Sequence, residues 1–137
     1  MTTEMGELLI PIDGEDSIIL ARQRARALAQ SLGFAPLDQS RIATGVSELA
    51  RNVVRYATDG KGQARIRALT ASKPGLEITV RDEGPGIPDV EQALGVGYTS
   101  GRGLGMGLPG TRRLMDEMEI DSAPGRGTTV TIRKWKR

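Results

Sequence analysis

The hydrophobic and polar positions divide the first part of the chain into a strand and a helix. The apolar run ELLIPI at residues 7–12 ends at Asp13-Gly14, which is typical of a strand followed by a turn. From residue 17 to residue 32, apolar side chains recur every three or four positions, polar side chains fill the rest, and Gly33 follows. This spacing predicts an amphipathic surface helix that ends at the glycine.

A second helix and two strands are predicted in the middle of the chain. Asp38 can cap a helix that continues along an apolar arc to Ala57, after which TDGKG interrupts it. The stretches QARIRALTA (63–71) and LEITVRD (76–82) are extended and joined by SKPG, which favours a hairpin.

The last part of the chain predicts a loop, a helix and two strands. A glycine-rich loop fills residues 84 to 107, and apolar spacing from Leu108 to Met118 indicates a third helix. The stretches EIDSA (119–123) and TTVTIRKW (128–135) read as strands around the turn PGRG. Short turns between consecutive strands predict one α+β domain: a two-layer sandwich with a mixed, mostly antiparallel sheet and helices on one face. We expect this single domain to occupy residues 1–137.

Composition limits the chemistry that such a domain can carry. The 137 residues include no Cys and no His, so a catalytic base must be a carboxylate, Lys or Tyr. A net charge of +2 and an aromatic content of 3% give no support for a nucleic-acid surface. The sequence contains no apolar run of membrane-spanning length and no signal-peptide pattern, so no membrane partner and a cytoplasmic location are expected.

The second predicted helix contains the first candidate for chemistry. In ELARN, Glu48 and Asn52 are four residues apart and therefore share a face, beside the apolar arc. An isolated pair of this kind is usually only an exposed polar edge, so the motif gains meaning only with partners.

The strand at 76–82 contains the second candidate. Alternation places Asp82 on the same face as Val80, where a carboxylate needs a partner or a ligand because an unpaired buried charge is costly. Gly84 and Gly86 follow and permit close approach to the backbone. An acceptor for the amino group of a flat ligand would fit here.

The stretch SGRGLGMGLPG contains the third candidate. Gly101, Gly103, Gly105 and Gly107 alternate with other residues before a helix, and exposed N–H groups at a helix start can hold phosphate. A plain flexible loop is the alternative explanation. The match of GMGLPG to G-x-G-x-x-G does not follow a strand, and no P-loop lysine is present, so any phosphate would be bound in another way.

The last predicted strand contains the fourth candidate. In GRGTTVTI, Thr128 falls on the same face as Val130 and Ile132, which points its hydroxyl inward near the end of the sheet. Thr is common in strands, so a purely structural role is the alternative explanation.

Taken in order, these motifs resemble the ATP-binding boxes of the GHKL superfamily, which has the Bergerat fold. The boxes are E-x-x-x-N on a helix, D-x-G-x-G after a strand, G-x-G-x-G before a helix and G-x-G-T before the last strand. They extend over nearly the whole chain. The resemblance implies ATP and Mg²⁺ as cofactors.

The resemblance also implies roles for the residues. Asp82 would accept a hydrogen bond from the adenine amino group with support from Thr128, and Asn52 would coordinate the Mg²⁺ that bridges the phosphates. The glycines that follow Asp82 belong to the same nucleotide-binding box. The segment 101–107 would wrap the phosphates as a lid. The residues of this box and this lid are Gly84, Gly86, Gly101, Gly103, Leu104, Gly105, Met106 and Gly107.

Within the superfamily, the sequence is similar to the small serine/threonine kinases of bacterial partner switching. SELARNVVRYA, GYTSGRGLGMGLPG and RRLMDEMEIDSAPGRGTTV look most like the RsbT type of stressosome switch kinase. Histidine kinases need a His-bearing hairpin, and gyrase-like ATPases add a second domain; neither is expected here. The resemblance implies a Ser or Thr substrate on a STAS-domain protein, and a PP2C-type phosphatase that the released kinase activates.

In this interpretation Glu48 is the general base and Arg102 stabilises charge on the transferred phosphoryl group. An exposed arginine that only keeps the lid soluble is the alternative for Arg102. Arg51 and Arg55 bring positive charge to the same turn, and an ion pair with Glu48 would weaken it as a base. Two other functions remain open: a nucleotide-dependent anti-sigma factor that binds a sigma factor directly, and a non-catalytic ATP-binding adaptor.

Overall fold

The computed structural model describes residues 7–57, 59–83, 107–122 and 127–137, which form five strands and three helices. Their order is the one that the hydrophobic pattern predicts. The elements are β1 (Glu7–Ile12), α1 (Glu15–Ser31), α2 (Pro36–Tyr56), β2 (Gly62–Thr70), β3 (Pro74–Asp82), α4 (Gly107–Leu114), β4 (Glu117–Ser122) and β5 (Thr128–Trp135).

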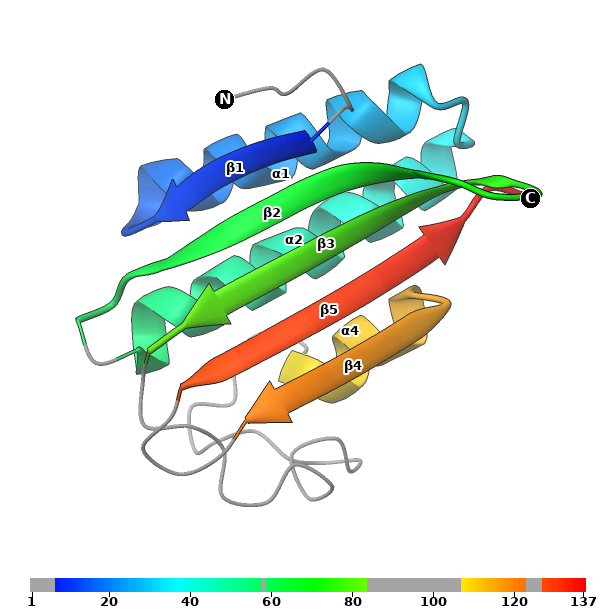
Figure 1. Cartoon of the computed structure of the whole chain (residues 1–137). Helices are drawn as coiled ribbons and strands as arrows, with labels where there is room; N and C mark the ends of the chain where they lie inside the picture. The colour runs from blue at the N-terminus through cyan, green and yellow to red at the C-terminus, as the bar shows by residue number, and fades with distance from the viewer. Residues whose placement is uncertain (1–6, 58, 84–106, 123–126) are drawn as a thin grey trace.

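The described strands form one sheet in the order β1-β2-β3-β5-β4, and each neighbouring pair is antiparallel. Figure 1 shows α1, α2 and α4 together behind this sheet, so the helices cover one face and leave the other open. The predicted α+β class, with helices on one face, is confirmed. Because β5 lies between β3 and β4, the last strand becomes central to the site described below.

The core lies between the sheet and the helices. Alternate strand residues point toward the helices and pack against the apolar arcs of α1 and α2. Burial of each large aliphatic side chain contributes about 1.5–3 kcal/mol. The fully buried large side chains are Ile12, Ile42, Leu49, Ile66, Leu76, Ile78, Ile132, Val46, Val53 and Thr111.

The helix α1 begins two residues earlier than predicted, and its start depends on Ser17. The Ser17 hydroxyl accepts hydrogen bonds from the backbone N–H of Asp13 (2.9 Å) and Gly14 (3.1 Å). It also donates to the Gly14 carbonyl at 2.8 Å. At the other end, Gly33 has a φ of 89°, which explains why the helix stops at a glycine.

The predicted cap of the second helix is wrong. Helix α2 starts at Pro36, which suits the first helical position, so Asp38 lies inside the first turn. Its Oδ1 accepts a hydrogen bond from Arg41 Nη1 (3.0 Å) and lies 3.8 Å from Lys134 Nζ. Asp38 therefore balances the charge of a buried lysine on β5 instead of capping the helix.

The predicted extent of the third helix is also wrong. Helix α4 ends at Leu114, whose carbonyl accepts a hydrogen bond from Lys134 Nζ at 2.8 Å. Met118 lies on β4, where it pairs with Ile132 of β5. Its position fits both a helical period and the alternation of a strand, and pairing with β5 decides between them.

The hairpin between β2 and β3 is confirmed, with a shorter loop than predicted. Pairing continues to Thr70 and Pro74, which leaves residues 71–73 as the connection. A Cβ on Gly75 would lie 2.5 Å from Trp135 Cε3, so this glycine lets the aromatic ring lie against the strand.

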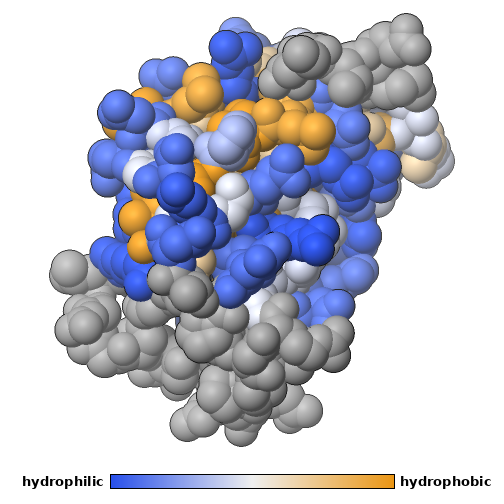
Figure 2. Space-filling model, turned by 60° about the vertical axis from the view of Figure 1, so that its left-hand side comes forward, coloured by the Kyte–Doolittle hydropathy of each residue, from blue (hydrophilic) through white to orange (hydrophobic). Residues whose placement is uncertain are grey.

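Large apolar side chains are exposed at a few described positions, namely Leu9, Ile19, Leu20 and Leu37. Figure 2 shows apolar surface near the top of the molecule, the end at which α1 and β1 lie, with hydrophilic residues below it. None of the helices in the described ranges is long and apolar enough to cross a membrane.

Candidate functional site

Three strand ends meet at one end of the sheet and bring Asp82, Ser122 and Thr128 together. Thr128 is the register partner of Asp82 on β3 and of Ser122 on β4. Residues opposite each other in an antiparallel pair point to the same face, so all three side chains are directed to the face that bears the helices. The orientation predicted for Thr128, alongside Val130 and Ile132, agrees with this pairing.

Hydrogen bonds fix the hydroxyl groups of this strand end. The Ser122 and Thr128 hydroxyl oxygens lie 2.9 Å apart, and Ser122 also donates to the Gly127 carbonyl at 3.0 Å. Asp82 is only partly buried, so its carboxylate is not sealed inside the core. A partly accessible carboxylate beside an oriented hydroxyl is suited to recognise a donor group on a ligand.

Sequence reasoning missed Gly127, which sets the position of this strand end. Its φ is 78°, and a Cβ there would clash with the Asp82 carbonyl and lie 2.9 Å from Glu83 Cα. The second glycine of G-x-G-T therefore lets β5 approach the end of β3 closely. The motif was visible in the sequence, but the atoms that require this glycine are about 45 residues away along the chain.

Replacement of Gly127 by alanine should destabilise the protein and displace the Asp82 backbone. We expect a loss of about 1–3 kcal/mol in the free energy of unfolding, because left-handed strain and a backbone clash add together. Urea unfolding measures it. Gly33→Ala is the matched control, since it has similar strain but meets only the flexible Lys136 side chain. An equal loss in both variants would show that the contact with Asp82 does not matter.

The second half of the candidate site lies on α2. Glu48 is buried and Asn52 is half-buried one turn further along the helix. Gly62 on β2 is the register partner of Asp82. A Cβ on Gly62 would lie 2.8 Å from Val53 Cγ1, so this part of α2 lies over the end of the sheet. The residue next to Asn52 thus packs directly against the strand pair that ends at Asp82.

The positive charge expected near Glu48 is present as an ion pair. Arg51 Nη1 donates to Glu48 Oε1 at 3.0 Å. Arg55 is exposed, and no ion pair within the described ranges involves it. Of the two arginines on this part of α2, it is therefore Arg51 that forms the ion pair with Glu48.

Several predicted site residues lie outside the described residues, and their roles remain predictions. Gly107 is the first residue of α4, which begins where the predicted lid ends. Within the described ranges no cluster of three or more carboxylates could hold a metal ion. The predicted residues outside those ranges are Gly84, Gly86, Gly101, Arg102, Gly103, Leu104, Gly105 and Met106.

A hollow of about 640 Å³ lies at the same end of the sheet but mostly on its open face. Side chains that alternate away from the helices form most of its lining, together with residues at the strand ends. Glu48 and Asn52 are not among its described lining residues, whereas Asp82 and Ser122 belong both to the hollow and to the strand end beneath the helices. The lining residues in the described ranges are Gln63, Arg65, Thr79, Arg81, Asp82, Glu83, Asp121, Ser122, Gly127 and Thr129.

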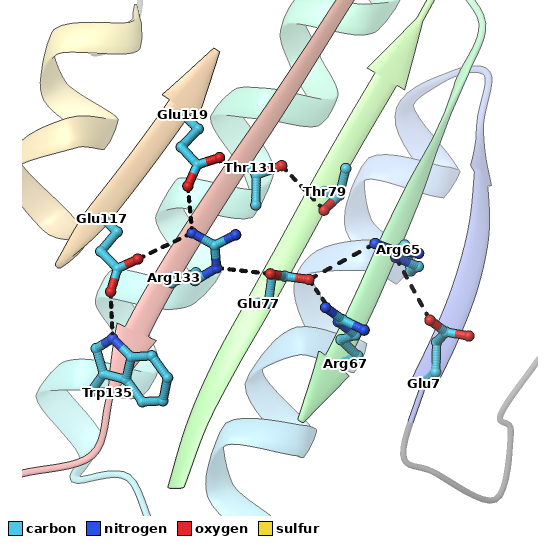
Figure 3. Close-up of polar contacts among 10 residues, drawn as sticks. All are labelled: Glu7, Arg65, Arg67, Glu77, Thr79, Glu117, Glu119, Thr131, Arg133 and Trp135. Atoms are coloured by element: carbon cyan, nitrogen blue, oxygen red, sulfur yellow. Dashed lines mark hydrogen bonds and ion pairs between the residues drawn. The ribbon is translucent and has the colours of Figure 1, made fainter. Parts of the chain in front are cut away.

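Sequence reasoning also missed Glu77, a buried carboxylate on the open face. Figure 3 shows it between arginines from the neighbouring strands, Arg67 on β2 and Arg133 on β5. Arg67 Nε donates to Glu77 Oε1 at 2.6 Å, and Arg133 Nε donates to Oε2 at 2.8 Å. Arg133 also binds two acidic residues of β4, Glu117 and Glu119, so charge pairs link β2, β3, β5 and β4.

These contacts determine the ionisation of Glu77. Burial opposes the charged form, but the hydrogen bonds and positive charges of Arg67 and Arg133 outweigh it and lower the pKa of Glu77. Hydrogen bonds to Glu119 and Glu77 raise the pKa of Arg133. We interpret the role of this network as structural, because it links four neighbouring strands of the sheet.

The lowered pKa of Glu77 predicts a loss of stability in acid. A carboxylate with a depressed folded-state pKa stabilises the protein above its unfolded value of about 4.5, and this contribution disappears as pH falls through the folded-state pKa. The free energy of unfolding should therefore fall below about pH 4.5, and less steeply in Glu77→Gln. Glu119→Gln, which removes an exposed partner of Arg133, should keep the wild-type slope. Equal slopes in all three proteins, measured by urea unfolding, would contradict the prediction.

Comparisons with known proteins show the family of the chain. Residues 13–134 match the histidine kinase-like ATPase domain family. The chain is 48% identical over 124 residues to the serine/threonine-protein kinase RsbT of Bacillus subtilis, covering 90% of this chain and 92% of that protein. It is 36% identical over 119 residues to the anti-sigma F factor of Caldanaerobacter subterraneus, covering 84% and 82% of the two chains.

Solved structures show the same fold. The RsbU and RsbW domains of Rv1364c from Mycobacterium tuberculosis match with a TM-score of 0.66 and 23% identity. This match covers 96% of the chain but only 32% of that longer chain. The mycobacterial sensor histidine kinase MprB matches with a TM-score of 0.58 and 21% identity, covering 95% and 99% of the two chains.

Proposed function

Because the chain belongs to the histidine kinase-like ATPase domain family, we propose that it is an ATP-dependent protein serine/threonine kinase of a bacterial partner-switching pathway. One observation carries the proposal. In a chain 48% identical to RsbT, Glu48 and Asn52 lie on the part of α2 that packs over the strand end formed by Asp82 and Thr128.

The types of residue in the site are those expected to bind a nucleotide. Asp82, with Thr128 beside it, would bind the adenine amino group, and Asn52 would coordinate Mg²⁺. Gly84, Gly86 and the lid segment 101–107 would contact the rest of the nucleotide. Bound ATP would supply the γ-phosphoryl group, whose bond to ADP breaks as the bond to the substrate oxygen forms.

Glu48 would accept the proton of the attacking Ser or Thr hydroxyl. Because the chain has no His, a carboxylate is a natural choice for this task, and no covalent enzyme intermediate is needed. Arg102 would place its guanidinium near the transferred group and stabilise the charge on it.

The partners follow from the type of kinase. We propose a Ser or Thr on a STAS-domain protein as the substrate, and a PP2C-type phosphatase as the partner that the released kinase binds and activates. The protein would act in the cytoplasm as a single kinase domain over residues 1–137. Neither nucleic acid nor membrane is part of this proposal.

A second candidate function is a nucleotide-dependent anti-sigma factor. The 36% identity to an anti-sigma F factor over 84% of the chain favours it. In that case the protein would capture a sigma factor directly, with nucleotide setting its shape. A non-catalytic adaptor is the weakest alternative, because Glu48, Asn52, Asp82 and Thr128 are all present.

Transfer of labelled phosphate tests the proposal. The purified chain would be incubated with γ-labelled ATP, Mg²⁺ and STAS-domain proteins from the same genome. We expect label on Ser or Thr of a STAS protein. Tight ATP binding without transfer, together with stable capture of a sigma factor, would favour the anti-sigma function instead.

A further inference from the structure

The ion pair between Glu48 and Arg51 has an unusual setting for two residues on one helix. The Glu48 side chain is 8% exposed, whereas the Arg51 side chain is 32% exposed. Exposed pairs at this spacing contribute little to stability. Here the carboxylate is buried, and burial of a carboxylate without partners costs free energy. The contact with the guanidinium is therefore favoured.

We propose that Arg51 is a positioning residue that holds the Glu48 carboxylate in the orientation from which it accepts the substrate proton. This inference rests on the proposed kinase function. Arg51 acts through Glu48, since its Nη1 binds Glu48 Oε1 at 3.0 Å. The contact occupies one carboxylate oxygen with a donor, and this restricts rotation of the carboxylate about its last side-chain bond. An ion pair also weakens a base, so the two effects of this contact change the rate in opposite directions, and the proposal requires that orientation outweigh basicity.

Proton transfer requires that the Glu48 carboxylate be held in one orientation. A general base must lie about 2.6–3.2 Å from the hydroxyl oxygen that it deprotonates. A displacement of about 1 Å can cost a factor of about 10² in rate. A glutamate has three rotatable side-chain bonds, and the planar guanidinium fixes its end better than an ammonium group does.

The neighbouring arginine supplies a matched control. Arg55 lies one turn beyond Arg51 on the same helix, is exposed and has no described ion pair. Arg51→Met and Arg55→Met therefore remove the same charge from adjacent turns of one helix, but only the first removes the contact with Glu48. Arg51→Lys keeps the positive charge but replaces the planar guanidinium by a shorter side chain with an ammonium group.

The first test uses the nucleotide-free protein. Thermal unfolding of Arg51→Met, Glu48→Gln and the double variant forms a double-mutant cycle. We expect each single change to lower Tm and the double change to lower it by less than their sum. In NMR spectra, the guanidinium of Arg51 should show slowed rotation that Glu48→Gln reduces. Additive Tm changes with an unrestrained Arg51 guanidinium would overturn the inference.

The second test is kinetic and separates this inference from the proposed function. For phosphoryl transfer to a STAS protein, Arg51→Met should lower kcat about 10- to 100-fold. The Kd for ATP should stay within about twofold, Arg51→Lys should recover part of the rate, and Arg55→Met should match wild type. If Glu48→Gln abolishes transfer while Arg51→Met matches wild type, the inference fails and the function stands. If Glu48→Gln retains full transfer, the base assignment and this inference both fail.

Discussion

Phosphoryl transfer should fall about 10²- to 10⁴-fold in Glu48→Gln, with little change in the Kd for ATP. The amide has almost the shape of the carboxylate and fills the same space, although without the charge its hydrogen bond from Arg51 is weaker. It cannot take the proton of the substrate hydroxyl. The loss should therefore appear in the rate constant of the chemical step, which single-turnover transfer of labelled phosphate measures directly.

The control for this variant is Glu15→Gln, which removes an exposed carboxylate from the first turn of another helix, α1. It should transfer phosphate at the wild-type rate. A Glu48→Gln protein with full activity would show that Glu48 is not the base. A variant that loses ATP binding as well would indicate that Glu48 holds the nucleotide site together instead.

Local patterns predicted much of the fold. The order of elements follows from helical spacing and strand alternation, because each helix buries one apolar stripe and each strand one face. The paired positions on α2 also follow from local geometry, since Glu48 and Asn52 are one helical turn apart. These features depend only on residues close to one another in the sequence.

Several of the features that sequence reasoning missed depend on distant partners. Asp38 lies inside α2 and balances Lys134 on β5, almost 100 residues away. Met118 joins a strand because β5 is there to pair with it. Glu77 looks like a solvent-facing strand residue until β2 and β5 bring an arginine to each side of it.

The candidate site was predictable to the same extent. Alternation correctly predicted which face of its own strand Thr128 occupies, but it could not show that Thr128 lies opposite Asp82. That pairing requires β5 to lie beside β3, an arrangement that skips β4 in the sequence order. The role of Gly127 has the same origin, because the clash that it avoids is with the end of β3.

The adenine contact proposed for Asp82 predicts a loss of both affinity and discrimination in Asp82→Ala. A hydrogen bond to a charged group contributes about 1.5–3 kcal/mol, so the Kd for ATP should rise about 10- to 100-fold. Wild type should bind ATP more tightly than inosine triphosphate, which has a carbonyl oxygen where adenine has its amino group. The variant should bind the two nucleotides almost equally, because it has no carboxylate to distinguish a donor from an acceptor.

Asp121→Ala provides the matched control, since this exposed carboxylate is next to Ser122 at the end of β4 but alternates away from the helices. It should keep the wild-type preference for ATP, and calorimetric titration of each protein with both nucleotides measures the difference. If Asp82→Ala kept the preference, adenine would have to be recognised elsewhere, and the hollow on the open face would become the next place to examine. If wild type itself failed to distinguish the two nucleotides, the base would be bound without a contact to its amino group, and the role proposed for Thr128 would fail with that of Asp82.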